Sequence, residues 1–172
     1  NINLGGRPWT AISKLTDTSA KTGYNGTFDG NGKTISGLNP VGELISGKYR
    51  GAGLFGYVYT GGTVKNVTVE GAMKAEWNCG GVVAYLAGGR VENCVNRMTL
   101  TATDRRVGGI AGILYSTGSI TNCANEGAVS SSYHGSEYQE GYKVYLGGIA
   151  GYAYGSISGS VNKGNVAATG AS

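Results

Sequence analysis

The chain has 172 residues, of which 33 are glycine and only 2 are proline, and its formal net charge is +4. Its glycines do not recur at every third position, which excludes collagen, and a hydrophobic content of 40% excludes a disordered chain. The basic residues are spread along the chain, which argues against a nucleic-acid-binding module. No run approaches the roughly 20 apolar residues of a membrane-spanning helix. A folded, glycine-rich β protein is therefore predicted.

The length suits a single domain covering residues 1–172, and residues 1–23 are predicted to form its N-terminal edge or cap. Ile2 and Leu4 alternate before a pair of glycines, and Trp9 then supplies a large aromatic side chain suited to covering the first repeat. The chain begins with Asn1 rather than Met and shows no signal peptide. We therefore expect it to be part of a longer, exported precursor.

A glycine-rich motif recurs within the repeat region, which is predicted to span residues 24–168. Its four copies are Gly53–Tyr57, Gly80–Tyr85, Gly108–Ile113 and Gly147–Tyr152. Aligning Gly53, Gly81, Gly109 and Gly148 gives steps of 28, 28 and 39 residues. Self-similarity at this period is typical of stacked supersecondary units.

Two further short apolar runs follow each copy of the motif. The second runs are Val64–Val67, Val91–Cys94, Ile120–Cys123 and Ile157–Ser160, and the third are Gly71–Met73, Met98–Leu100, Gly127–Val129 and Gly164–Val166. Short apolar runs bounded by turn residues indicate strands. The pattern predicts an all-β, parallel β-helix (solenoid) of about five coils, with three short strands per coil. It should be right-handed, because parallel crossover connections almost always are.

Alternation along the first strand of each coil predicts which face is buried. One column of large apolar residues is expected inside, with the small residues two positions later on the same face: Leu54, Val82, Ile110 and Ile149, then Gly56, Ala84, Gly112 and Gly151. The opposite face carries two files of tyrosines, with Ile113 and Ala87 as gaps: Tyr57, Tyr85 and Tyr152, then Tyr59, Tyr115 and Tyr154. Rings about 4.8 Å apart can stack, whereas an exposed aromatic patch marks an interaction site. The pattern allows both interpretations.

Asparagine and cysteine also recur in register. Asn66, Asn93 and Asn122 form one file, and Asn96, Asn125 and Asn162 form another, which predicts structural amide ladders at the bends. Cys94 and Cys123 occupy one repeat position and are expected to be buried, reduced and side by side. A bond between them is conceivable at this spacing, but no disulfide framework or zinc motif is present.

Residues 130–146 are predicted to form an inserted loop, because they account for the 39-residue step. Insertions in solenoids lie in loops, which are often on the binding face. Four loop tyrosines would form one wall of a groove beside the tyrosine files or would cover them: Tyr133, Tyr138, Tyr142 and Tyr145. The candidate ligand-binding residues are the six tyrosines of the two files together with Tyr133, Tyr138 and Tyr142.

The run from Tyr24 to Leu38 and the later Gly53-Leu54-Phe55-Gly56 and Gly-Gly-X-Ala-Gly copies resemble the GLUG repeat of bacterial cell-surface proteins. The resemblance extends from about Leu4 to Ala168. It implies an extracellular or cell-surface location, as in adhesins and in the non-catalytic regions of IgA-specific metallopeptidases. It is weak evidence on activity.

Catalytic candidates are few. His134 is the only histidine and lies in the predicted loop, without spacing that defines a nucleophile. The acidic residues fall singly, whereas glycosidases need paired carboxylates. We therefore expect no enzymatic activity, no catalytic residues, no cofactor and no metal.

Two classes of function remain from the sequence. The chain is either a stalk or spacer that holds flanking domains of a longer protein away from the cell, or an adhesive module that binds a glycan or an extracellular host protein. A carbohydrate-binding or carbohydrate-degrading β-helix domain is the alternative. No nucleic-acid partner and no membrane insertion by this segment are expected.

Overall fold

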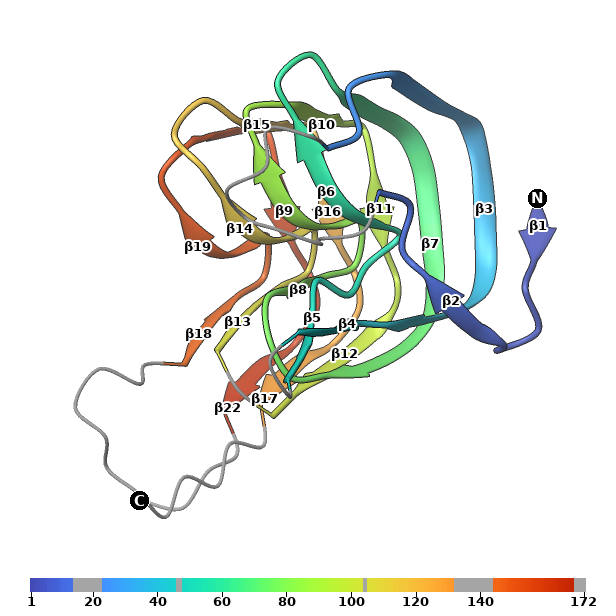
Figure 1. Ribbon diagram of the computed structural model, residues 1–172. Coiled ribbons are helices and arrows are strands. Elements are labelled where there is room, and N and C mark those ends of the chain that lie inside the picture. The colour runs from blue at the N-terminus through green and yellow to red at the C-terminus, as the bar shows by residue number, and fades with distance from the viewer. Residues whose placement is uncertain (14–22, 46–47, 104, 132–143, 169–172) are drawn as a thin grey trace.

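The computed structural model of the chain describes residues 1–13, 23–45, 48–103, 105–131 and 144–168 (Figure 1). The described chain is all-β, with parallel strands arranged in curled sheets. Among the described residues there is no helix long and apolar enough to cross a membrane.

Two smaller parallel sheets are built from the glycine-rich motifs. The strands after each glycine pair form a four-stranded sheet, which we call the tyrosine sheet, in the order β19 (Ala150–Ala153), β14 (Ala111–Leu114), β9 (Val83–Ala87) and β6 (Phe55–Tyr59). The strands that end at the first glycine of each pair form a three-stranded sheet, which we call the short sheet. Its order is β18 (Tyr145–Gly147), β13 (Arg106–Gly108) and β8 (Cys79–Gly80).

The remaining parallel strands belong to one 13-stranded sheet. Its central path is β20 (Ser156–Ser158), β15 (Ser119–Thr121), β10 (Arg90–Glu92), β7 (Thr63–Ala75), β11 (Val95–Asn96), β16 (Ala124–Asn125) and β21 (Val161–Asn162). The other members are β1 (Ile2–Asn3), β2 (Pro8–Thr10), β3 (Thr27–Val41), β12 (Thr99–Ala102), β17 (Val129–Ser131) and β22 (Val166–Ala168). An antiparallel hairpin is added by β4 (Glu43–Ile45) and β5 (Lys48–Arg50).

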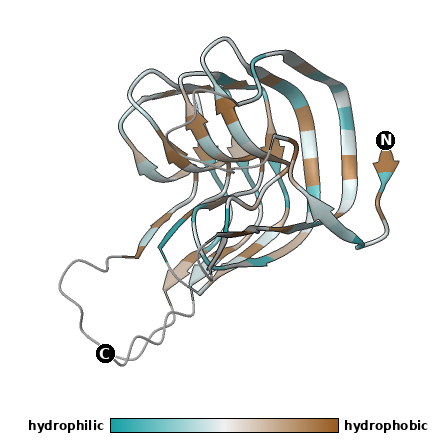
Figure 2. Ribbon diagram, in the orientation of Figure 1, coloured by the Kyte–Doolittle hydropathy of each residue, from teal (hydrophilic) through white to brown (hydrophobic). Residues whose placement is uncertain are grey.

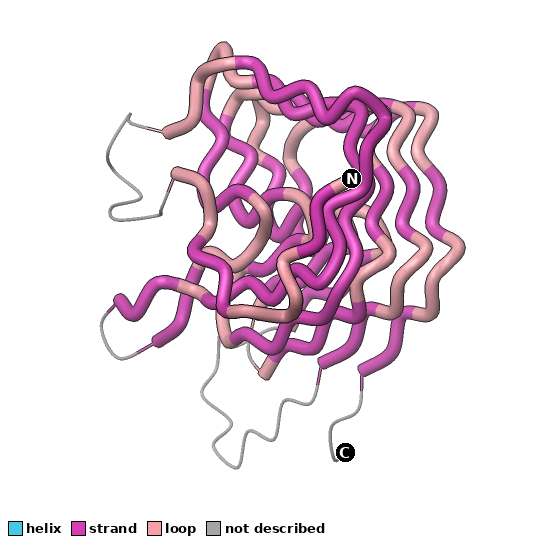
Figure 3. Tube along the Cα trace, turned by 90° about the vertical axis from the view of Figure 1, so that its right-hand side faces the viewer, coloured by secondary structure: helices cyan, strands magenta, loops and turns pink. Residues whose placement is uncertain are grey.

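Pairing joins each strand to its equivalent in the next repeat, as the stacked traces of Figure 3 show. One file runs through five repeats, from Phe28 through Val64, Val91 and Ile120 to Ile157. The predicted alignment of Val64, Val91, Ile120 and Ile157 is thereby confirmed, whereas Ile35, expected to match Val64, pairs with Val69 instead. Apolar and polar residues alternate along β3 and β7, which leaves one face of these strands for the interior (Figure 2).

The number of strands per repeat differs from the prediction of three. The repeat from Cys79 to Ala102 contains five short strands, β8 to β12. A bend at Gly81 and Val82 separates the first two strands, and Asn93, with a φ of 52°, separates β10 from β11. A left-handed residue interrupts the extended backbone, and the periodicity of apolar residues does not reveal such a break.

The predicted interior column is confirmed. Leu54, Val82 and Ile110 are buried, and Ile149 is partly buried against the same core. The column residue Ile110 donates its backbone N–H to Ile149 (2.9 Å), in keeping with the predicted register.

The strict alternation after this column is wrong. Val83 and Ala111 also lie in the main core, whereas Ala84 belongs to a separate cluster with the tyrosines. The file that contains Ala84 and Gly112 has small side chains because the tyrosine sheet and the short sheet come into contact there. A Cβ on Gly112 would lie only 2.8 Å from the Cys79 backbone nitrogen. Two consecutive residues therefore face the core after each glycine bend.

The two ends of the described stack differ. Trp9 is partly buried against the core and its indole N–H donates to the Leu54 carbonyl (3.2 Å), so it covers the first repeat as expected. In the last described repeat, Ile157 and Val166 are 42% and 38% exposed, although their equivalents Ile120 and Val129 are fully buried.

Candidate ligand-binding surface

The two predicted tyrosine files exist and differ in burial. The inner file pairs Tyr57 with Tyr85, Tyr85 with Ile113, and Ile113 with Tyr152. In the outer file Tyr59 pairs with Ala87, and the register of β14 and β19 places Tyr115 beside Tyr154. Tyr57 and Tyr85 are only 6% and 3% exposed, whereas Tyr115 and Tyr154 are 36% and 63% exposed. Only the outer file presents rings freely to solvent.

Burial of the inner file creates a second hydrophobic cluster beside the main core. Tyr57, Tyr85, Ile113 and Ala84 form this cluster, with Tyr59 and Ala87 packed against it. The Tyr57 ring lies 6.1 Å from both the Tyr59 and the Tyr85 rings. Of the two interpretations left open by the sequence, structural stacking accounts for Tyr57 and Tyr85. Tyr133, Tyr138 and Tyr142 lie outside the described residues.

The hydroxyl of Tyr85 is satisfied by the short sheet. The side-chain amide of Asn78 donates to the Tyr85 oxygen. Burial raises the pKa of Tyr85 to about 12, although Arg50 and Arg106 act to lower it. The two arginines therefore lie close enough to act electrostatically on this hydroxyl.

A run of contacts then crosses from the short sheet to the outer tyrosines. We call Asn78, Arg106, Tyr145, Tyr152 and Tyr154 the arginine–tyrosine cluster. Arg106 donates to the Asn78 side-chain oxygen (3.4 Å), and its guanidinium carbon lies 5.8 Å from the Tyr145 ring centre and 5.1 Å from that of Tyr152. The Tyr152 ring meets those of Tyr145 and Tyr154 edge-on, with centroids 4.8 Å apart in both pairs.

The sequence prediction missed Asn78 and Arg106 as members of this surface, and it assigned Tyr145 to the inserted loop, whereas Tyr145 begins β18. The sequence does contain a pattern that relates the three residues, because each stands two positions before a motif glycine: Gly80, Gly108 and Gly147. Pairing of Arg106 with Tyr145 in β13 and β18 confirms that they share a file. The two tyrosine files follow only the strand after the glycines, and alternation along that strand carries no information about the strand before them.

A second cationic stack lies at the start of the short sheet. Trp77 is held between two guanidinium groups, with the carbon of Arg50 3.8 Å and that of Arg105 4.2 Å from its ring centre. Cation–π contacts of this kind stabilise by roughly 0.5–1 kcal/mol at exposed sites. Neither Trp77 nor its arginines had been predicted as functional.

The asparagine files are confirmed as structural ladders. Asn66, Asn93 and Asn122 all have positive φ, between 52° and 55°, and Asn93 donates to the Asn66 side-chain oxygen (3.2 Å). In the second file, Asn96 donates to Asn125 and Asn125 donates to Asn162, each at 2.7 Å. Asn96 and Asn125 are fully buried.

This buried amide ladder explains one glycine of the repeat motif. A Cβ on Gly81, Gly109 or Gly148 would overlap the side chain of Asn96, Asn125 or Asn162, respectively. The glycine and the asparagine of each repeat, separated by some 15 residues, are therefore two halves of one packing arrangement. The sequence prediction recorded both files but did not connect them.

The thiols behave as predicted. Cys79, Cys94 and Cys123 are buried and free, and the Cys94 backbone N–H lies 3.4 Å from the Cys123 sulfur. The neighbouring thiol of Cys123, together with burial, raises the pKa of Cys94. Burial raises the pKa of Cys79 to about 12, so neither thiol has the character of a nucleophile.

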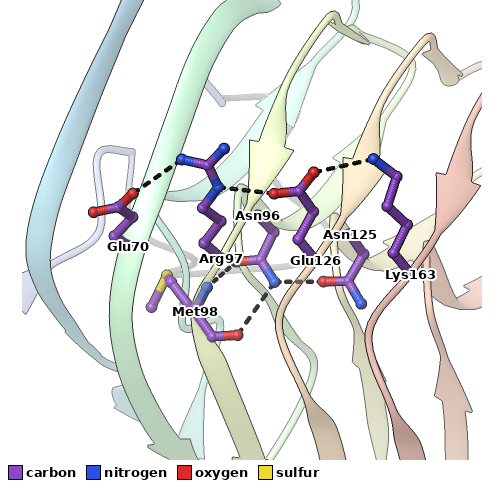
Figure 4. A network of polar contacts seen from close by, with 7 residues as sticks. All are labelled: Glu70, Asn96, Arg97, Met98, Asn125, Glu126 and Lys163. Atoms are coloured by element: carbon purple, nitrogen blue, oxygen red, sulfur yellow. Dashed lines mark hydrogen bonds and ion pairs between the residues drawn. The ribbon is translucent and has the colours of Figure 1, made fainter.

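Three acidic residues of the described chain, Asp29, Glu70 and Glu126, form ion pairs with basic side chains. Within that part, no group of three or more His, Cys, Asp and Glu side chains is placed to hold a metal. Glu70 and Glu126 alternate with Arg97 and Lys163 in an exposed charge ladder (Figure 4). His134 lies outside the described residues. A hollow at the N-terminal edge is lined by Asn3, Leu4, Gly5, Arg7, Pro8 and Trp9, and contains none of the candidate tyrosines.

Comparison with known proteins agrees with the resemblance noted in the sequence. The model of the family described as the GLUG motif matches residues 103–130. A protein of Haloquadratum walsbyi named halomucin is 37% identical over 100 residues, which cover 58% of this chain and 1% of that protein. No solved structure matches the chain. The chain therefore carries a GLUG-motif repeat region, as predicted.

Proposed function

We propose that the chain is a right-handed parallel β-helix and acts as a non-catalytic spacer module of an exported, cell-surface protein. The single observation that carries this proposal is the in-register stacking of equivalent residues, which runs through five repeats from Phe28 to Ile157. Such a stack places each repeat against its neighbours only, so length can be added without redesigning a core. The helix is proposed to be right-handed because crossover connections between parallel strands almost always are.

An extracellular or cell-surface location is supported by the GLUG motif at residues 103–130 and by the likeness to halomucin. The match covers 1% of that relative, which suits a small module repeated or joined to others within a long chain. An antibody against the chain, applied to intact cells of its source, should label them until the cells are treated with external protease. Labelling that requires permeabilised cells would contradict this location.

The spacer function is tested by lengthening the stack. Residues 80–107 end one position before the next motif copy, so tandem copies inserted after Val107 preserve the register. Each copy should lengthen the particle by about 4.8 Å along the stacking axis, measured by small-angle X-ray scattering, with an unchanged circular-dichroism spectrum per residue. Inserted copies that are disordered, or that form a separate domain, would contradict the solenoid.

The lack of activity is proposed on the residues described. Acidic side chains stand singly or between cations, as Glu126 does between Arg97 and Lys163. The purified chain should therefore release no reducing ends from polysaccharides. Release that is abolished by one point substitution would instead establish the carbohydrate-degrading alternative.

An adhesive role is the second candidate, favoured by the exposure of Tyr115 and Tyr154. Its ligand would be a glycan or an extracellular protein. A glycan array probed with the chain and with the Tyr115→Ser/Tyr154→Ser variant tests it, and binding should be lost without a fall in melting temperature. Tyr85→Ser is the matched control for a structural tyrosine, and it should lower the melting temperature because Tyr85 is buried.

A further inference from the structure

The strongest feature outside the spacer function is the arginine–tyrosine cluster. Its members come from three successive repeats and are joined by contacts from Asn78 through Arg106 to Tyr152 and Tyr154. The cluster lies where the short sheet meets the tyrosine sheet. Arg106, Tyr145 and Tyr152 lie in paired strands, and Asn78 and Tyr154 stand directly before β8 and directly after β19.

Within the part of the chain that the structure describes, no carboxylate pairs with Arg106. Its Nε is buried and has no hydrogen-bond partner among the described residues, and its guanidinium donates there to the neutral side chain of Asn78. Arg97, by contrast, pairs with Glu70 (3.2 Å) and Glu126 (2.8 Å). A partly buried guanidinium without an anionic partner is unfavourable, and an oxyanion that binds in bidentate fashion corrects this.

The surroundings add to the positive potential. Arg50 acts together with Arg106 on the hydroxyl of Tyr85, and Arg105 lies on the far side of Trp77 from Arg50. Glu76 is the described acid nearest in sequence to this group, and it acts on the thiol of Cys79. Glu43 lies opposite Arg50 in the β4–β5 hairpin, so the described charged residues of this region are three arginines and two glutamates, and their formal charge is net positive.

The aromatic part of the cluster is open to solvent. Tyr154 is 63% exposed, and its hydroxyl lies 2.8 Å from that of Tyr152. Tyr115 precedes it in the outer file and is 36% exposed. An exposed ring can pack against the C–H face of a pyranose, while the paired hydroxyls can exchange hydrogen bonds with sugar hydroxyls.

We infer that the arginine–tyrosine cluster binds a sugar residue that carries an oxyanion, either a uronate carboxylate or a sulfate ester. Arg106 is the partner of the oxyanion, and Tyr154 is the platform for the ring. The inference deepens the adhesive candidate function and rests on it, because it names the ligand class for that surface. A sugar suits this surface better than a peptide, because a pyranose ring and its oxyanion match Tyr154 and Arg106, which Tyr152 connects through contacts of 4.8 and 5.1 Å.

The test measures binding of the full chain to three probes by titration calorimetry. These are a heparin oligosaccharide, a hyaluronan oligosaccharide and a neutral dextran oligosaccharide. Heparin, hyaluronan or both should bind, and dextran should bind much more weakly. Binding of heparin alone assigns the sulfate ester, and binding of both assigns any oxyanion.

Two variants locate the site and one controls for charge. Arg106→Gln should weaken binding roughly ten-fold or more, as expected for loss of a hydrogen bond to a charged group. Tyr154→Ala, at an exposed position, should also weaken it without lowering the melting temperature. Arg90→Gln removes the same charge from an exposed residue of β10 and should leave affinity within about two-fold, since distant surface charges are screened.

The possible results separate the two levels of the proposal. Equal binding of dextran and the acidic probes would overturn the oxyanion inference and leave the adhesive function standing. No binding of any probe at low salt would overturn the oxyanion inference, and the glycan array with the Tyr115→Ser/Tyr154→Ser variant would then decide the adhesive function separately. Equal losses of affinity for Arg90→Gln and Arg106→Gln would show non-specific charge attraction and overturn the site. Binding of poly-glutamate as tight as that of the glycans would indicate an acidic protein partner and overturn it as well. If the Arg106→Gln variant fails to fold, the affinity of the Tyr154→Ala variant for the acidic probes tests the site in its place.

Discussion

Two ladders run along the same strands one residue apart, and they face opposite ways (Figure 4). The amide ladder of Asn96, Asn125 and Asn162 lies toward the interior, with both links at 2.7 Å. The charge ladder joins Glu70, Arg97, Glu126 and Lys163 through contacts of 3.2, 2.8 and 3.2 Å. Asn96 and Asn125 are fully buried, whereas the Arg97 side chain is 49% exposed.

The comparison shows that burial, more than the strength of a contact, determines how far a ladder constrains the sequence. Each buried amide must keep all its partners, because an unsatisfied polar group in the interior is costly. It also occupies space that forces glycine at positions 81, 109 and 148. Exposed ion pairs exchange readily with water and salt. The charge ladder accordingly places no comparable demand on its neighbours.

The largest effect is expected from Asn125→Leu in the middle of the amide ladder. The change leaves an Asn96 N–H and the Gly127 carbonyl without partners in the interior. At roughly 1–3 kcal/mol for each buried group, the free energy of unfolding should fall by about 3–5 kcal/mol. Urea denaturation followed by circular dichroism measures it. Asn162→Leu, at the exposed end, is the control and should cost much less; equal costs would remove the distinction between the two ladders.

Gly109→Ala tests whether the amide ladder determines the glycine motif. The new methyl group would overlap the Asn125 side chain and the Gly148 carbonyl, so unfolding should become easier by about 2–3 kcal/mol. Gly26→Ala provides the comparison, because its Cβ would meet only the end of the Tyr24 side chain, at 3.3 Å. A Gly109→Ala variant as stable as Gly26→Ala would show that the two motifs are not linked.

Alkaline pH should reveal the buried titratable group of the tyrosine sheet. Because the pKa of Tyr85 is raised to about 12, mainly by burial, the unfolded chain loses this proton first as the pH rises above about 10. The free energy of unfolding should therefore be unaffected by this residue below pH 10 and should fall between pH 10 and 12, by on the order of 2 kcal/mol. Tyr85→Phe should flatten the decline in a pH series of urea titrations. An unchanged slope would mean that the hydroxyl is not buried in solution.

The smallest effect is expected from Glu126→Gln in the charge ladder. Hydrogen bonds from Arg97 and Lys163 lower the pKa of Glu126, so its contribution is present above pH 4.5 and is lost as the pH falls. The variant should melt slightly below the wild type at neutral pH and low salt, and the difference should vanish at acid pH or high salt. Scanning calorimetry at both pH values measures this difference. A loss as large as that of Asn125→Leu would contradict the comparison.

Sequence alone determined the features that depend on register. The glycine motif placed Leu54, Val82, Ile110 and Ile149 in one column, and the asparagine and cysteine files stacked as their spacing required. Parallel pairing of identical repeats brings equivalent positions together whatever the curvature of the sheets. The repeat period therefore contained this information.

The tertiary structure decided which faces are covered. Both tyrosine files have the same pattern in sequence, yet Tyr85 is buried and Tyr154 is exposed, because the short sheet packs against only one of the files. The bend at each glycine pair turned two successive residues inward, and it brought Arg106 from a neighbouring strand to the tyrosines. Contacts between sheets depend on the bend angle of the backbone, and the angle arises from steric contacts between residues far apart in the chain. Periodicity within a strand carries no information about that angle.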